Sequence, residues 1–487
     1  MFIRHSVPFI YTVMNIFQTI KQETSAFKDK TAVIDGERSV SYEQLVSSAE
    51  LLADSMKRAG VSPYDRVALL CKDSIEYIQA SLAVLSLSAV MVPVAIEHTK
   101  DEIRGILKHI AVNYLVFEHG SYADSGSDSL DCPGFSQMGF RILNRGEQDP
   151  PDGEYYNMNP AFIRFSSGTT GASKGVVLSH EAILERTSAA DKGLHITHED
   201  TVLWVLSMSF HFVVTILLFL RRAATIVLCS SHFPESLIDG ISRHKGTFIY
   251  ASPFHYNALT HMESLSSESF KNVRLAVSTA MKLPEYVARG FHEKSGIELS
   301  EAYGIIEVGL PFINLSSDER KRGSVGRALP DYDLKIVDPD RDGAGSIHIK
   351  GKGVLDAYYS PWQNRQSILK DGWFDTGDLG RLDNEGYLTI VGRGKDVINF
   401  AGMKIFAQEV EEVINLFPEV RESCVYGEEH AIYGQLPMAM VVVNEGAGLS
   451  VDELRKYCYR MLAQYKVPKG FEVVDSIPRT ASGKIRR

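Results

Sequence analysis

The strongest constraint on the fold is an alternation of short apolar runs with longer helix-like runs. RVALLC (66–71) and VMVPVA (90–95) are short and apolar, as buried strands are, and the run 74–90 between them has the length of a helix. The same rhythm resumes after residue 161 and continues to about residue 310. Strand–helix–strand alternation of this kind predicts a mostly parallel sheet covered by helices, which makes the fold class α/β.

The pattern changes after about residue 323. YDLKIVD, GSIHIKG, WFDTGDLGRLD and GYLTIVG are short alternating runs bounded by Gly or Asp, which predicts an antiparallel, β-barrel-like subdomain. After GRGKD (392–396), helix-like and strand-like runs form a small α+β unit. We therefore expect a large domain over 1–392, made of βαβ-built sheets and the subdomain, and a small mobile C-terminal domain over 393–487.

Composition excludes several classes of protein. The formal net charge of −10 argues against nucleic acid as a partner. The five cysteines are scattered and form no CxxC pair, so a reduced, cytoplasmic protein without a zinc site or disulfide framework is expected. The N-terminal apolar run lacks a signal-peptide cleavage site. The apolar run 203–220 contains His211 and two serines, so it is interpreted as a buried helix or strand–helix unit and not as a transmembrane segment.

One loop carries the composition of an anion site. In SSGTTGASKGVVLSH (166–180), three glycines free the backbone to point N–H groups inward, hydroxyl side chains add donors, and Lys174 adds a positive charge. A triphosphate would fit. The loop is not a P-loop, because the spacing from Gly171 to Lys174 is wrong and Gly175 stands where Ser or Thr would hold magnesium. From these residues alone, a phosphate loop and a simple linker remain equally open.

Three further motifs follow the loop: EAYGIIEVG (301–309), WFDTGDLG…GYLTIVGRGKD (373–396) and PRTASGKIRR (478–487). With the loop, they resemble the adenylate-forming enzymes, which include acyl-CoA synthetases, peptide-synthetase adenylation domains and beetle luciferases. The resemblance runs from about residue 30 to the end and is closest in character to carboxylate–CoA ligases. It implies a two-step reaction: a carboxylate attacks the α-phosphate of ATP to give acyl-AMP and pyrophosphate, and a thiol then displaces AMP.

The resemblance assigns the nucleotide-binding residues. Tyr303 would stack on adenine, Gly304 would let the backbone approach the nucleotide, Asp378 would accept from the ribose hydroxyls, and Arg393 would reach the ribose or a phosphate. The β- and γ-phosphates and the adenine slot would be contacted by Ser166, Ser167, Gly168, Thr169, Thr170, Gly171, Lys174 and Ala280.

The family also implies catalytic and moving parts. Glu307 matches the magnesium-associated glutamate, although Ile306 stands where the family usually has a threonine that binds the α-phosphate. Lys484 matches the lysine that stabilises charge in the first half-reaction. Lys395 falls at the hinge between the domains, and Gly402 lies in the segment that lines the thiol tunnel.

The acid-binding segment follows the same resemblance. His211 matches an aromatic or histidine gate and is counted with Lys484 and Glu307 as catalytic. Amino-acid adenylation domains place Asp after the corresponding Phe210, so an α-amino acid is not expected. The expected pocket residues are Phe210, His211, Val214, Phe254, Ser278 and Ile306.

The implied cofactors and partners are ATP, Mg²⁺, CoA and a small aromatic or aliphatic acid. A stand-alone ligase that loads the pantetheine thiol of an acyl carrier protein is the alternative. A degenerate nucleotide-binding protein is a third, suggested by Ile306.

Overall fold

The computed structural model describes residues 14–118, 138–143, 153–165, 174–400, 403–479 and 485. The chain divides into two compact units. The first contains Met1–Thr247 with Gly353–Arg365, and the second contains Phe248–Lys352 with Gln366–Arg487. The predicted division at 392/393 is a different boundary and stays a prediction.

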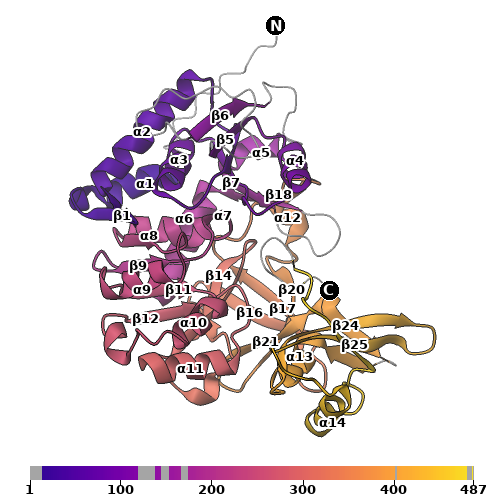
Figure 1. The fold of residues 1–487 in the computed structure, drawn as a ribbon. Helices are drawn as coiled ribbons and strands as arrows, with labels where there is room; N and C mark the ends of the chain where they lie inside the picture. Colours follow the sequence, from indigo (N-terminus) through magenta and orange to yellow (C-terminus); the bar gives the residue numbers. More distant parts are fainter. Residues whose placement is uncertain are drawn as a thin grey trace. The chain divides into compact units, whose positions relative to one another are not determined.

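An eight-stranded sheet forms the core of the first unit (Figure 1). Its strands, in spatial order, are β19 (Gln363–Asn364), β18 (Ala357–Tyr358), β8 (Gly175–Ser179), β7 (Pro160–Phe165), β4 (Val90–Pro93), β3 (Arg66–Leu70), β5 (Tyr114–Glu118) and β6 (Met138–Ile142). The central pairs β7–β4, β4–β3 and β3–β5 are parallel, as the βαβ rhythm predicts. Helices α3 (Ile75–Ser86) and α4 (Lys100–His109) provide the crossovers, and each begins at a Ser or Thr cap.

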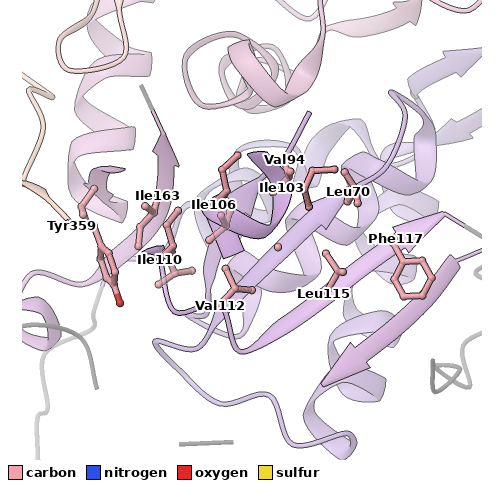
Figure 2. Packing of buried hydrophobic residues seen from close by; sticks show 14 of the residues in the cluster. Leu70, Val94, Ile103, Ile106, Ile110, Val112, Leu115, Phe117, Ile163 and Tyr359 are labelled. Atoms are coloured by element: carbon pink, nitrogen blue, oxygen red, sulfur yellow. The ribbon is translucent and has the colours of Figure 1, made fainter. Parts of the chain in front are cut away.

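The face of this sheet against α4 is a closed apolar core. Figure 2 shows Ile103, Ile106 and Ile110 packed with Val112 and Leu115, and all five are buried. Ile103 and Ile106 are three residues apart, so they lie on one side of α4 and give it a buried face. This packing fixes β7, the strand that leads into the predicted phosphate loop.

The other strands of the first unit are β9 (Thr201–Trp204), β10 (Thr225–Leu228), β1 (Thr31–Asp35) and β2 (Arg38–Ser41), with helices α1 (Ile16–Glu23), α2 (Tyr42–Arg58), α6 (His180–Leu194) and α9 (Glu235–Ser242). The apolar run 203–220 folds as the end of β9, then α7 (Met208–His211), a π-helix η2 (Phe212–Ile216) and the start of α8 (Leu217–Arg221). This is the strand–helix unit that was predicted. Within the described ranges, no helix is long and apolar enough to cross a membrane.

The second unit continues the parallel rhythm. Its strands β11 (Phe248–Ala251), β12 (Leu275–Ser278) and β13 (Leu299–Ile305) are parallel, and β14 (Gly309–Ile313) turns back antiparallel to β13 and pairs with β15 (Arg327–Ala328). Helices α10 (Pro253–Thr260) and α11 (Glu285–Ser295) connect the parallel strands.

The predicted antiparallel subdomain is a four-stranded sheet of β16 (Tyr332–Val337), β17 (Gly345–Gly351), β20 (Phe374–Leu382) and β21 (Leu388–Arg393). The C-terminal α+β part has five strands, β22 (Val397–Phe400), β23 (Met403–Phe406), β24 (Val420–His430), β25 (Gly434–Val443) and β26 (Gly470–Val473), with helices α13 (Ala407–Asn415) and α14 (Val451–Met461) (Figure 1). Buried residues at four-residue spacing, Val410 and Ile414 on α13 and Leu454 and Cys458 on α14, give this part its own apolar core.

Candidate functional site

Three residues predicted to bind the nucleotide meet at one carboxylate in the second unit. Asp378 on β20 and Arg393 on β21 are directly paired across the antiparallel ladder. Arg393 Nε lies 3.0 Å from Asp378 Oδ1, and the Tyr303 hydroxyl donates to Asp378 Oδ2 at 2.5 Å. The Asp378 side chain is only 6% exposed. The fold therefore brings together residues separated by up to 90 positions in sequence, and their predicted role in nucleotide binding stays a prediction.

The surroundings of the Tyr303 hydroxyl keep it protonated. Burial and the neighbouring Asp378 carboxylate raise the pKa of Tyr303 well above its ordinary range. Tyr303 therefore remains a hydrogen-bond donor at neutral pH, while Arg393 provides the opposite charge to Asp378. This arrangement presents a fixed, negatively charged acceptor on rigid strands.

The turn between β13 and β14 holds Ile306 and Glu307, and both side chains are half-buried. Gly304 precedes this turn. A Cβ added there would lie 2.4 Å from the carbonyl oxygen of Gly309, so the hairpin itself requires glycine. The predicted approach of the Gly304 backbone to a nucleotide stays a prediction. No group of three or more side chains that could hold a metal ion occurs in the described part of the chain.

Two more predicted site residues lie at the end of β12 and in the loop that follows it, Ser278 and Ala280. Ser278 is fully buried, and Ala280 has a φ of +72°, a left-handed conformation that is unusual for alanine. Phe254, a predicted pocket residue on α10, is 63% exposed. In this structure Ser278 therefore offers no surface for an acid to touch, whereas Phe254 does.

The predicted acid-binding segment lies in the first unit, on α7 and η2. Phe210, His211 and Val214 are half-buried, and Phe212 and Val213 between them are buried. The Thr215 hydroxyl donates to the His211 carbonyl, inside a π-helix. π-Helical turns are rare and are frequent at functional sites.

Two charged residues that sequence reasoning missed hold this segment. Both carboxylate oxygens of Asp73 accept from the Met208 N–H, at 3.0 and 3.1 Å. The Arg164 guanidinium donates to the Phe210 carbonyl and lies 5.7 Å from the centroid of the Phe210 ring. A charged residue inside the apolar strand PAFIRF was the available signal for Arg164.

Of the predicted phosphate loop, the first residue that the structure describes is Lys174. Its Nζ donates to Gln363 Oε1 at 3.2 Å and lies 4.6 Å from the centroid of the Tyr358 ring. Lys395 lies in the short helix η5 (Gly394–Asp396), with Nζ 3.8 Å from Asp396 Oδ1. The remaining predicted site residues lie outside the described ranges: Ser166, Ser167, Gly168, Thr169, Thr170, Gly171, Gly402 and Lys484.

Comparison with known families decides the identity. Residues 20–359 match the model of the AMP-binding enzyme family, and residues 409–484 match the model of the AMP-binding enzyme C-terminal domain. This chain belongs to the AMP-binding enzyme family. The recognition made from the four motifs is thereby confirmed.

Relatives of this AMP-binding enzyme agree with that assignment. An indoleacetate–CoA ligase of Aromatoleum aromaticum is 29% identical, with 97% of each chain covered. A long-chain-fatty-acid–CoA ligase of Yersinia pestis is 26% identical over 97% of this chain and 93% of its own. The structure of o-succinylbenzoate CoA synthetase from Bacillus subtilis with its acyl-adenylate intermediate superposes with a TM-score of 0.82, at 25% identity and 98% coverage of both chains. The predicted fold class and the enzyme class, an AMP-forming acid–thiol ligase, are confirmed.

Proposed function

We propose that this AMP-binding enzyme activates an apolar carboxylic acid with ATP to an acyl adenylate and transfers the acyl group to the thiol of CoA. The observation that carries the proposal is the meeting of Tyr303, Asp378 and Arg393 at one buried carboxylate. A carboxylate accepts two hydroxyl donors at once, which suits the vicinal diol of a ribose. The paired arginine sets the charge and direction of that acceptor.

Mg²⁺ is proposed as the metal of the reaction. Mg²⁺ keeps several waters and typically binds one or two carboxylates together with substrate phosphates, so Glu307, a half-buried carboxylate in the turn between β13 and β14, suits it. When bound, the metal would offset charge on the phosphates as pyrophosphate leaves. Glu307 would hold the ion, and Lys174 would contribute positive charge to the phosphate loop.

The acid is proposed to be aromatic or aliphatic and not an α-amino acid. Phe210 is followed by His211, so no carboxylate stands there to pair with an amino group. The half-buried Phe210 and Val214 offer apolar surface. The relatives named for indoleacetate and for long-chain fatty acids act on acids of these two kinds.

The moving parts are proposals as well. We assign the hinge to Lys395, the thiol tunnel to Gly402 and the charge-stabilising lysine of adenylation to Lys484. The separate apolar core of the C-terminal strands and helices supports a small domain that moves as one body. A cytoplasmic location is part of the same proposal.

The acceptor is tested by supplying two thiols in competition. The enzyme, ATP, Mg²⁺ and a panel of aromatic and aliphatic acids are incubated with CoA and with a holo acyl carrier protein, and thioesters are identified by mass. We expect acyl-CoA to form. Thioester on the carrier protein alone would overturn the CoA assignment and favour the carrier-loading ligase.

A further inference from the structure

Glu301 on β13 connects two segments that the proposed function places at the nucleotide. It lies two residues before Tyr303, and its side chain is 5% exposed. Its Oε1 accepts from the backbone N–H of Leu283 at 3.0 Å. Leu283 belongs to the loop 279–284, which joins β12 to α11 and contains Ala280. One buried side chain thus ties the Ala280 loop to the strand that carries Tyr303.

The loop needs such a tie because its backbone is strained. Ala280 has a φ of +72°, in the left-handed region where a side chain with a Cβ is strained. Strained residues persist where surrounding contacts hold them. The described bonds at the two ends of this loop are Thr279 N–H to the Ala251 carbonyl at 3.0 Å and Leu283 N–H to Glu301.

The surroundings of Glu301 Oε2, the second oxygen of this carboxyl group, favour the protonated state. Glu301 and Ser278 are directly paired in the parallel ladder of β12 and β13. Neither Glu301 Oε2 nor Ser278 Oγ has a hydrogen-bond partner among the described residues, and both atoms are buried. A buried ionised oxygen without a donor is costly, whereas a carboxylic acid is neutral and can donate its proton to an acceptor such as a neighbouring hydroxyl.

Electrostatics supports the same state. Burial raises the pKa of Glu301 to about 7; the Leu283 hydrogen bond and the charge of Lys282 oppose the rise, and the charge of Glu412 adds to it. Lys282 of the loop and Glu412 of α13 are thus the charged groups that act on Glu301.

We propose that Glu301 is a positioning residue that holds the Ala280 loop in its nucleotide-binding conformation and does so as a neutral carboxylic acid. This rests on the proposed function, because the loop matters only if it contacts the nucleotide. In the neutral acid, the carbonyl oxygen still accepts the Leu283 N–H, and the second oxygen no longer carries a buried negative charge. Glutamine reproduces both features and cannot ionise. Alanine removes the acceptor.

The test compares Glu301→Gln and Glu301→Ala with the wild type by AMP affinity and by melting temperature. Losing the acceptor for the buried Leu283 N–H should release the Ala280 loop, so Glu301→Ala should bind AMP about tenfold more weakly, which corresponds to about 1.4 kcal/mol. Glu301→Gln should bind within about twofold of the wild type. Glu411→Ala is the matched control, because Glu411 is also buried and also accepts a backbone N–H, from Val425 at 2.7 Å. It should lower the melting temperature while leaving AMP affinity within about twofold.

A pH series tests the neutral state without any nucleotide. The folded protein holds a proton on Glu301 that the unfolded chain releases between its ordinary pKa of 4.5 and about 7. The wild type should therefore lose stability relative to Glu301→Gln as the pH rises through that window, with no further loss above it. If the wild type binds no AMP, the proposed function fails, and this series still decides the protonation claim. Unchanged AMP affinity in Glu301→Ala, a Gln variant as weak as the Ala variant, or a pH-independent melting difference would each overturn the proposal.

Discussion

Two aspartates anchor the segments proposed to bind the nucleotide and the acid, and they do so in different ways. In the second unit, Asp378 is bound by Arg393 and by the Tyr303 hydroxyl, so its charge is matched by side chains of the predicted nucleotide site. In the first unit, Asp73 accepts from the Met208 N–H through both oxygens, and burial raises its pKa to about 7. Asp378 is thus part of a charge cluster, whereas Asp73 holds a backbone.

Because of this difference, we expect the two segments to tolerate different amino-acid substitutions. Charge pairing at Asp378 depends on the identity of three side chains. This suits a site that would bind the same nucleotide, ATP, whichever acid is activated. A bond from Asp73 to a backbone N–H fixes the position of α7 but leaves the side chains after Met208 free to vary. We infer that acid preference is set by residues such as Phe210 and Val214 on a scaffold that does not depend on them.

Among the substitutions proposed, we expect the largest loss of activity from one that affects adenylation itself and neither Asp378 nor Asp73. Lys484→Ala removes the charge proposed to stabilise the adenylation transition state, and loss of one such group typically costs about 10²- to 10³-fold. Acid-dependent pyrophosphate exchange should fall by that factor, while thioester formation from supplied acyl-adenylate should persist. Adenylation at the wild-type rate would remove Lys484 from the mechanism.

The next effect breaks the charge cluster. Asp378→Ala leaves Arg393 without its carboxylate, and hydrogen bonds to charged groups are worth about 1.5–3 kcal/mol, so the KM for ATP should rise about 10- to 100-fold. The KM for the acid should change far less. Asp318→Ala, which removes an exposed aspartate paired with Arg320, is the control and should leave both constants near wild type. Equal increases in both KM values would contradict the separation of the two segments.

The acid segment should show the opposite pattern. His211→Ala removes a half-buried ring that packs edge-on against Trp204, with the ring centroids 6.2 Å apart, and should raise the KM for the acid by up to about tenfold, as the loss of about 0.5–1.5 kcal/mol of aromatic contact implies. The KM for ATP should stay within about twofold. A change confined to ATP would move His211 out of the acid site.

The smallest effect concerns the Asp73 anchor. Asp73→Asn keeps an acceptor for Met208 but cannot ionise, so the KM for the acid should change by only a few-fold. Because the folded pKa is raised from 3.8 to about 7, the wild type should lose stability relative to Asp73→Asn as the pH rises through that window. Melting temperatures across that range measure this difference. A difference that does not vary with pH would show that Asp73 is ionised throughout.

The motifs pick out the three residues that meet at Asp378, because each motif carries its residues at fixed positions; that they bind a nucleotide stays a prediction. Tyr303, Asp378 and Arg393 were named from sequence and meet in the structure. The π-helix over Phe212–Ile216 was not predicted, since an apolar run has the same local pattern in an α- or a π-helix. The anchoring by Asp73 and Arg164 was missed because it links segments far apart in sequence.

The sheet to which β18 and β19 belong could not be predicted from their place in the sequence. Strands β18 and β19 lie within the stretch interpreted as the antiparallel subdomain, yet they join the N-terminal eight-stranded sheet beside β8. Each has two residues, too few to show an alternating pattern. They bring Tyr358 and Gln363 to Lys174, a contact that no local pattern predicts.

Acid-dependent adenylation is the activity that most directly tests whether this enzyme is a ligase. The wild-type enzyme is incubated with ATP, Mg²⁺ and labelled pyrophosphate, with each acid of an aromatic and aliphatic panel in turn and with no thiol present. We predict that label enters ATP with at least one apolar acid and not with α-amino acids. Binding of ATP without exchange for any acid would contradict the central claim and leave a nucleotide-binding protein without ligase activity.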